Sequence, residues 1–469
     1  MYISTFFPNY LNTLDNDLCM IERKIYKRLE QWKERVDHKP LLVKGQRQVG
    51  KSFIIEEFAK NDYGNYIILD FNTDKAARKL FKDSLDPDSI VRNIEQYTDK
   101  RVNGRDTLLI FDEIQLCLSA RSSLKSFAKS KKYDVIASGS LLGVAISRDK
   151  DDDDDSIPPV GFEEQITMYS CDFEEFLWAK GISKETTESI RANIHGKKRF
   201  NQAILERFSS LYREYLVVGG MPEAVQKYVD TNSISEVRRI QDIILNTITD
   251  DIIRYAPEGQ KMRTLACYRS IPSQLSETNG KFQFSRVEGV SGRKDMRSMS
   301  ENLLWISGAG YGNFAVSLTS PELPLESFEK RKSFKIYVSD TGLLVRQYGN
   351  DTANAVFNGQ NGYNVGPVIE NAVAESLTKA GFIPRWYRKN SEKDRMELDF
   401  VIPLDGNVGV IEVKSGRDKD STSLEKVSRF FDIGRKIMFE NDNISMKDGV
   451  EHYPLFAAAF SDELGSQKE

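Results

Sequence analysis

Apolar residues in the first 170 positions fall into short runs separated by amphipathic stretches. Runs of this length with helical patterns between them are typical of parallel strands, which are buried on both faces of a sheet. The pattern predicts an α/β fold over residues 1–171, entered through a charged amphipathic helix at 18–37. The expected strands begin at Leu41 and continue at Tyr66–Phe71, Thr107–Phe111, Tyr133–Ser138 and Gln165–Ser170, with helices near 88–97 and 119–130.

The middle of the chain follows a helical pattern. We expect residues 172–261 to form a helical subdomain attached to the sheet, and residues 262–350 to form a second unit. Helices followed by a two-stranded ribbon predict a winged-helix-like segment for the second unit, and a purely structural helical module is the alternative. Its expected elements are helices at Leu265–Leu275 and Met296–Ser307 and strands at Phe314–Leu318 and Ser333–Val338.

A polar stretch rich in glycine and asparagine, residues 352–365, predicts a linker. Residues 366–460 beyond it predict a separate small α/β domain. The elements expected there are helices at Pro367–Ala380 and Ser423–Phe431 and strands at Arg385–Arg388, Glu397–Pro403, Val408–Lys414 and Lys436–Phe439.

Composition narrows the classes of function. The net charge of −4 provides no overall basic field, so any surface for nucleic acid must be local. The four cysteines are scattered without a C-x-x-C pair and the three histidines are isolated, which argues against a zinc site and against histidine-based catalysis. No run of 18 apolar residues occurs and the N-terminus lacks a signal-like pattern, so we expect a cytoplasmic protein with no membrane partner.

The strand at Leu41 runs directly into the pattern G-x-x-x-x-G-K-[ST]. Two glycines let the backbone turn tightly so that its N–H groups point at phosphate oxygens. Lys51 is expected to reach the β- and γ-phosphates, while the Ser52 hydroxyl binds Mg²⁺. The loop therefore predicts ATP and Mg²⁺ as cofactors. The expected nucleotide contacts are Gly45, Gln46, Arg47, Gln48, Val49, Gly50, Lys51, Ser52 and Phe53.

The strand at Thr107–Phe111 ends in two acids. Asp112 is expected to hold Mg²⁺, and Glu113 to polarise the attacking water as general base. The following strand ends in small polar residues, of which Ser138 or Ser140 is the candidate sensor of the γ-phosphate. A helix cap or turn is the structural alternative for these serines.

Arginines supplied by a neighbouring subunit often complete such sites. Arg148, Arg213 and Arg254 are candidates by position, and the sequence does not choose among them. The acidic run Asp149–Asp155 predicts a solvated loop, with a calcium or basic-partner site as the alternative.

A second chemical centre is expected near the C-terminus. Alternation along a strand places Glu412 and Lys414 on one face, and the preceding strand brings Asp399 beside them. Two carboxylates and a lysine match the needs of Mg²⁺-dependent phosphodiester cleavage, with Glu370 as a further acidic ligand. A surface salt-bridge cluster without cleavage activity is the alternative.

The stretch Arg385–Lys389 is basic and aromatic. Such a stretch predicts a contact with a nucleic acid backbone, and an edge strand carrying solvated charges is equally compatible.

Eight segments carry a family resemblance. In chain order they are GQRQVGKS, IFDEIQ, ASGSLLGV, FEEFLWA, YLVVGGMPEAVQ, IPSQLS, SDTGLL and IEVKSG. Together they resemble a large uncharacterised family of prokaryotic AAA+ ATPases that carry a C-terminal domain of undetermined function. The resemblance spans about residues 20 to 457. It implies an AAA+ P-loop core, a winged-helix-like middle and a C-terminal domain similar to restriction endonucleases.

One position departs from the family. Its members usually place Lys or Arg after Pro-Val-Gly, whereas this chain has Phe162 after Gly161. If the basic residue serves the γ-phosphate, hydrolysis here is slow or differently assisted.

These observations predict an ATPase whose nucleotide cycle controls a DNA-directed C-terminal domain. A homo-oligomer is compatible with the sequence, which does not decide the oligomeric state. One alternative is an ATP-dependent switch with little turnover and an inactive nuclease-like domain. Another is an Mg²⁺-dependent nuclease for which ATP is only regulatory.

Overall fold

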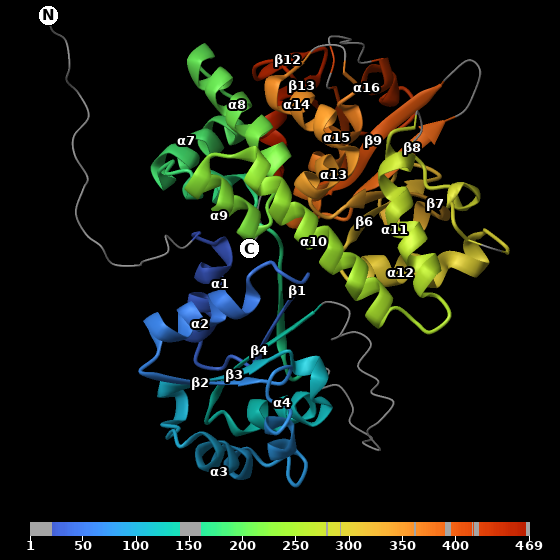
Figure 1. Ribbon diagram of the computed structural model, residues 1–469. Coiled ribbons are helices and arrows are strands. Elements are labelled where there is room, and N and C mark those ends of the chain that lie inside the picture. Colours follow the sequence, from blue (N-terminus) through green and yellow to red (C-terminus); the bar gives the residue numbers. More distant parts are fainter. Residues whose placement is uncertain are drawn as a thin grey trace, which may run out of the picture.

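Two β-sheets organise the chain, one in its N-terminal third and one in its C-terminal half (Figure 1). The computed structural model describes residues 21–140, 161–277, 280–290, 292–360, 363–389, 395–414, 416 and 422–465. The acidic run at 149–155 and Arg148 lie outside the described residues.

The first sheet has five strands in the order β2-β3-β4-β1-β5, and all its pairs are parallel. This confirms the parallel sheet expected from the apolar runs. Because parallel strands share their carboxyl edge, the loops after β1, β3 and β4 meet at one end of the sheet. The strands are β1 (Leu41–Gly45), β2 (Asn65–Asp70), β3 (Thr107–Asp112), β4 (Asp134–Ser140) and β5 (Glu164–Met168).

Alternate side chains of these strands bury against helices on opposite faces, as the period of two requires. On β1, Leu42 packs into the cluster that contains α3 and α4, whereas Val43 packs into the cluster that contains α1 and α2. The sheet is therefore a layer buried on both sides. The covering helices are α1 (Lys24–Glu34), α2 (Lys51–Asp62), α3 (Pro87–Thr98) and α4 (Leu118–Ser130), with 3₁₀ turns at Ala77–Phe81, Gly104–Asp106 and Ile114–Leu116.

A run of helices follows the first sheet, as the sequence predicts. The long helix α10 runs diagonally from beside α9 to beside α11 (Figure 1). The helices are α6 (Phe173–Ala179), α7 (Lys184–His195), α8 (Gln202–Val218), α9 (Pro222–Thr231), α10 (Ile234–Tyr255), α11 (Lys261–Leu275), α12 (Met296–Gly308), α13 (Thr341–Tyr348), α14 (Asn350–Asn358), α15 (Gly366–Lys379) and α16 (Thr422–Val427), with 3₁₀ turns at Phe284–Arg286, Leu325–Phe328 and Leu455–Leu464.

The second sheet has eight strands in the order β12-β13-β11-β10-β9-β8-β6-β7. It mixes parallel pairs, such as β10 with β11, and antiparallel pairs, such as β9 with β10. The C-terminal half is thus a separate α/β region, as expected. The strands are β6 (Gly312–Leu318), β7 (Glu329–Val338), β8 (Arg385–Lys389), β9 (Met396–Leu404), β10 (Asn407–Val413), β11 (Arg435–Glu440), β12 (Ser445–Lys447) and β13 (Val450–Pro454).

The hairpin β6–β7 differs from its expected place. The sequence predicts that these two strands form the ribbon of a winged-helix-like segment. In the structure β6 also pairs in parallel with β8, so the hairpin joins the C-terminal sheet. The stretch 352–365, expected to be a linker, begins within helix α14. A strand edge pairs with whichever partner the tertiary structure brings to it, and local sequence does not encode that choice.

One apolar cluster joins the helical run to one face of the second sheet. It extends from Phe173 on α6 to Phe460 near the C-terminus, whose rings lie 6.2 Å apart. The middle and C-terminal regions therefore share a core. Among the helices that the structure describes, none combines the length and apolar content needed to cross a membrane.

Candidate functional site

The loop after β1 has the backbone that its glycines permit. Gly50 adopts a φ of 89° at the start of α2, a left-handed conformation that favours glycine. A Cβ on Gly45 would lie 2.3 Å from the carbonyl oxygen of Met168 on β5. The two fixed glycines are thus required by a tight turn and by a close backbone approach.

Lys51 lies folded over this loop. Its Nζ donates hydrogen bonds to the carbonyl oxygens of Gly45 (3.1 Å) and Gln46 (2.9 Å). Burial lowers the pKa of Lys51, and the nearby carboxylates of Glu113 and Asp112 act in the opposite direction. A buried cation at the N-terminus of a helix is suited to an anionic ligand.

Two serines from two different elements bond to Asp112. The Ser52 hydroxyl at the start of α2 donates to Asp112 Oδ1 at 3.0 Å, and the Ser138 hydroxyl on β4 donates to the same carboxylate. A hydroxyl beside a carboxylate is an oxygen donor set that fits Mg²⁺, which takes one or two carboxylates together with nucleotide phosphates. The residues predicted to hold the ion are therefore adjacent.

Glu113 follows Asp112 at the tip of β3. Its φ of 53° turns the chain out of the strand, and its backbone N–H donates to Ser138 Oγ at 3.3 Å. The Gln115 side-chain amide donates to its carboxylate. The Glu113 side chain thereby lines the cavity beside the phosphate loop.

This nucleotide cavity has a volume of about 380 Å³. Its walls come from the phosphate loop, from β3, from the loop after β2 and from the C-terminal end of α10. The lining residues are Arg47, Gln48, Gly50, Lys51, Ser52, Phe53, Asn72, Glu113, Leu116, Thr247, Arg254 and Tyr255.

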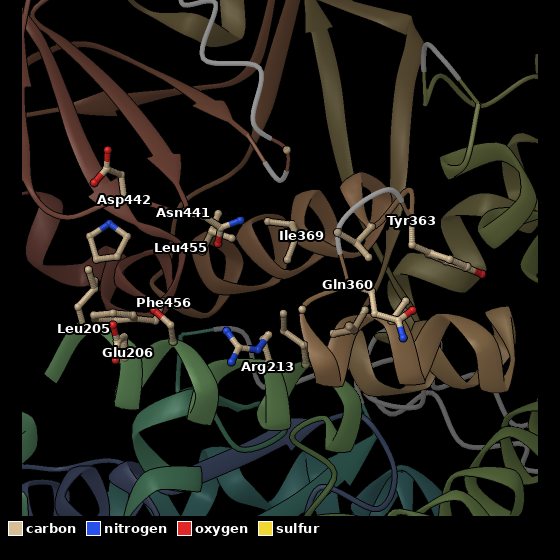
Figure 2. Close-up of a pocket in the computed structure, with 18 of the residues that line it drawn as sticks. Leu205, Glu206, Arg213, Gln360, Tyr363, Ile369, Asn441, Asp442, Leu455 and Phe456 are labelled. Carbon is tan, nitrogen blue, oxygen red and sulfur yellow. The ribbon is translucent and has the colours of Figure 1, made fainter. Parts of the chain in front are cut away.

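The cavity separates the arginine candidates. Arg254 lines it from α10 of the same chain, with its guanidinium 5.3 Å from the centre of the Tyr255 ring. Arg213 on α8 lines a different cavity of about 880 Å³, which Gln360 and Tyr363 also line (Figure 2). Of the two candidates that the structure describes, Arg254 is the one that lines the nucleotide cavity, and it belongs to the same chain as the phosphate loop.

Two further positions singled out in the sequence, Ser140 and Phe162, are not among the residues that line the nucleotide cavity. Ser140 ends β4 in register with Gly45, one strand away from the loop. The ring of Phe162 packs under the ammonium groups of Lys125 (5.2 Å) and Lys129 (5.6 Å) on α4. Phe162 does not line the nucleotide cavity.

Two side chains of the phosphate loop bond to the C-terminal part of the chain. Gln46 Oε1 accepts from the Ser339 hydroxyl at 3.1 Å. Arg47 Nη1 lies 3.0 Å from Asp251 Oδ1 on α10, and the Tyr311 hydroxyl donates to Asp251 Oδ2 at 2.7 Å. These contacts connect the loop to α10 and to residues that flank β6 and β7 of the second sheet.

Sequence reasoning missed Asp251, Ser339, Thr247 and Tyr255. A signal existed for Asp251, because it follows Ile244 and Ile248 in the buried stripe of α10. An acid in an apolar stripe needs a polar partner. Ser339 offers no such signal.

The expected C-terminal acids lie on β9, β10 and α15. Asp399 Oδ2 on β9 accepts from the backbone N–H of Val413 at 2.9 Å, which fixes it beside β10. Glu412 and Lys414 form an ion pair at 2.6 Å. Glu370 on α15 accepts from Lys335 Nζ at 2.7 Å and from the Tyr337 hydroxyl at 2.5 Å.

Burial and like charge control the protonation of this acidic group. Burial and the charge of Glu370 raise the pKa of Asp399 to about 7, against the opposing charge of Lys335. Burial also raises the pKa of Glu412, although Lys414 opposes it. In the part of the chain that the structure describes, no group of three or more His, Cys, Asp or Glu residues is placed to hold a metal ion.

The stretch Arg385–Lys389 forms an inner strand between β9 and β6, not an edge strand, and its side chains divide between the two faces of the sheet. Arg385 is buried, with Nη2 2.7 Å from Glu326 and Nε 2.9 Å from Glu329, and Tyr387 packs in the core. Neither reaches a nucleic acid, because a strand inside the sheet turns alternate side chains inward. Trp386 and Arg388 lie on the other face and line a cavity.

Comparisons with known proteins agree with the nucleotide site. Residues 37–177 match the family described as AAA domain. This segment is an AAA-type P-loop ATPase domain. Residues 209–354 and 365–457 match two domains of unknown function, DUF8612 and DUF4143.

No curated protein matches the chain. Among solved structures, a Walker-type ATPase of Pyrococcus abyssi is 12% identical over 70% of this chain and 96% of that chain, with a TM-score of 0.39. A RuvB variant of Thermotoga maritima is 13% identical over 61% and 87% of the two chains, with a TM-score of 0.29. AMPPCP-bound DnaA from Aquifex aeolicus is 12% identical over 61% and 86%, with a TM-score of 0.26. Similarity at these identities and TM-scores does not establish an activity for the whole chain.

Proposed function

We propose that this protein hydrolyses ATP at the nucleotide cavity and that its nucleotide state controls a DNA-directed C-terminal region. The observation that carries the first half is the meeting of Ser52, Asp112 and Glu113 beside Lys51 at one edge of the parallel sheet.

Each residue has a distinct task in this reaction. The N–H groups of the loop and Lys51 bind the phosphates, while Ser52 and Asp112 hold the ion. Bound Mg²⁺ neutralises charge on the β- and γ-phosphate oxygens. Glu113 takes a proton from the attacking water, and Arg254 provides positive charge from α10.

ATP turnover and nucleotide binding, measured separately, test the assignment. Glu113→Gln should retain binding and lose about 10²- to 10⁴-fold in kcat, because only proton transfer is removed. Lys51→Ala should lose binding, and Lys60→Ala on the exposed face of α2 is the matched control. Tight ATP binding by the wild type with negligible turnover, no higher than that of Glu113→Gln, would favour an ATP-dependent switch instead.

Coupling to the C-terminal region rests on the contacts of the phosphate loop. Gln46 bonds to Ser339, and Arg47 reaches Tyr311 through Asp251. A phosphate that draws Lys51 or Arg47 towards it changes the partners of these residues. The second sheet therefore responds to nucleotide through direct contacts.

A nuclease is the second candidate, favoured by Asp399 lying beside the strand that carries Glu412 and Lys414. Incubation of plasmid and of single-stranded DNA with Mg²⁺ or Mn²⁺ tests it. Cleavage should be lost in both Asp399→Ala and Lys414→Ala. Cleavage that persists in both variants points to a contaminant, and its absence from the wild type leaves a nuclease-like region without activity.

A further inference from the structure

A cavity of about 560 Å³ opens at one edge of the second sheet. It lies where β6, β7 and β8 meet the segment before the 3₁₀ turn at Phe284–Arg286. We call it the basic cleft. Its lining residues are Lys281, Gln283, Ser317, Lys330, Ser333, Trp386 and Arg388.

The basic cleft contains a buried hydrogen-bond donor without an acceptor. Trp386 is 3% exposed, and no described residue accepts from its indole Nε1. Buried indole N–H groups normally find a partner, because leaving one unpaired costs free energy. The residue that carries this unpaired donor also lines the cleft.

The charge of the cleft is positive. Lys281, Lys330 and Arg388 contribute three cations, and the lining residues that the structure describes include no carboxylate. Glu397 opposes this charge, and its Oε2 lies 3.7 Å from Arg388 Nε. Exposed Arg331 extends the positive surface along β7.

The charged side chains on β7 can also be explained by its position at the edge of the sheet. β7 is the last strand of its sheet, and charged side chains there prevent pairing with another sheet. That explanation covers Lys330 and Arg331. It does not cover Lys281 and Arg388, which come from other elements, or the unpaired indole.

The floor of the cleft adjoins the acidic group. Lys335 Nζ lies 5.4 Å from the centre of the Trp386 ring and pairs with Glu370 at 2.7 Å. The charges of Glu370 and Lys335 in turn act on Asp399. A ligand in the cleft therefore lies beside the acids expected to act on phosphodiesters.

We propose that the basic cleft binds the phosphodiester backbone of single-stranded nucleic acid, with a phosphate oxygen accepting from Trp386 Nε1. This inference rests on the DNA-directed role proposed above and names its binding site. A single strand fits because the donor is recessed, and a flexible backbone can bring one phosphate down to it. The surrounding cations hold that phosphate and its neighbours.

Fluorescence anisotropy of a dye-labelled oligothymidylate of about 15 nucleotides, a length that covers one ssDNA site, tests the inference. The full chain is titrated without nucleotide and with EDTA present. Release of counterions by three cations gives an expected slope of about −2 for the logarithm of affinity against that of salt concentration. Duplex DNA of the same length should bind more weakly.

The variants separate charge from hydrogen bonding. Lys281→Ala with Lys330→Ala should weaken binding about tenfold and flatten the salt slope, because two phosphate contacts are lost. Trp386→Phe keeps the ring and removes the donor, so binding should weaken severalfold with the slope unchanged. Lys447→Ala, an exposed lysine on β12 at the opposite edge of the sheet, is the matched control.

Three results would overturn the inference. They are wild-type affinity in the double lysine variant, equal competition by polyglutamate, and equal or tighter binding of duplex DNA. ATP turnover of the cleft variants should match the wild type, because their side chains do not line the nucleotide cavity. Oligonucleotide binding without any ATP turnover would contradict the proposed ATPase activity but not the proposed binding by the basic cleft. ATP turnover without oligonucleotide binding would contradict the proposal for the cleft alone.

Discussion

At the scale of single residues, position in the fold decides what a charge does. The sequence gives no reason to prefer Arg213 or Arg254 as the arginine of the nucleotide site, yet the two residues line different cavities. Asp399 and Asp251 are both buried acids. Asp251 is satisfied by Arg47 and Tyr311, whereas Asp399 lies among other acids and its pKa rises.

Arg254→Ala should lower ATP turnover at least tenfold, because it removes the positive charge that α10 brings to the nucleotide cavity. Arg254→Lys should recover part of the loss. Since Arg254 acts in cis, mixing Arg254→Ala with Glu113→Gln should not restore turnover in a steady-state assay. Recovered activity in the mixture would show that the arginine serves a neighbouring subunit.

The Asp399 carboxyl should make unfolding depend on pH. Its folded pKa of about 7 exceeds the unfolded value, so the native state binds the extra proton and stability falls as pH rises from about 4 to 7. Denaturant unfolding across this range should show a smaller decline for Asp399→Asn than for the wild type. Parallel curves for the two proteins would contradict the assignment.

At the scale of elements, two helix ends approach backbone to backbone. A Cβ on Gly342, at the start of α13, would lie 2.5 Å from the Cα of Gly219, which follows α8. Asp340 caps α13 through Leu343 N at 3.0 Å and also accepts from Gly220 N at 2.7 Å. The YLVVGGMPEAVQ and SDTGLL segments of the sequence thus form one contact.

Gly342→Ala should destabilise the protein by about 2 kcal/mol or more, because the new methyl group collides with backbone that cannot move independently. The matched control is Gly64→Ala, where the nearest atom to an added Cβ is the Asp106 carbonyl oxygen at 3.9 Å. Urea unfolding of both variants measures the difference. Equal midpoints would show that the two helix ends separate easily.

At the scale of the whole molecule, the phosphate loop lies against both halves of the chain. Gln46 and Arg47 contact residues about 200 to 290 positions away in sequence. The shared apolar core then joins those residues to the second sheet. A change at the nucleotide cavity therefore has a physical route to the basic cleft.

Hydrogen exchange should detect this route. Nucleotide at 100 times its Kd should slow exchange by up to about 100-fold at amides whose exchange requires an opening that releases the nucleotide, including those around Ser339 and the end of α10. Gln46→Ala should lose the effect near Ser339 and keep it in α2. The matched control is Lys44→Ala on β1, whose Nζ bonds to Gln165 at 2.9 Å. Identical patterns in the wild type and Gln46→Ala would exclude this contact as the route.

The sequence by itself determined the local parts of this protein. The loop from Gly45 to Ser52, the Asp112–Glu113 pair and the parallel sheet follow from short-range rules, since glycine conformations, strand periodicity and a helix start are fixed by neighbours in the chain. The pairing of Asp399 with the Glu412 strand was also predictable, because a tight turn joins the two strands.

Only the tertiary structure decided which distant residues meet. Asp251 and Ser339 reach the phosphate loop, β6 joins β8, and Arg254 rather than Arg213 lines the nucleotide cavity. These outcomes depend on which surfaces bury the most apolar area together, a property of the whole chain that no local pattern records. The same holds for the basic cleft, whose cations come from three separate segments.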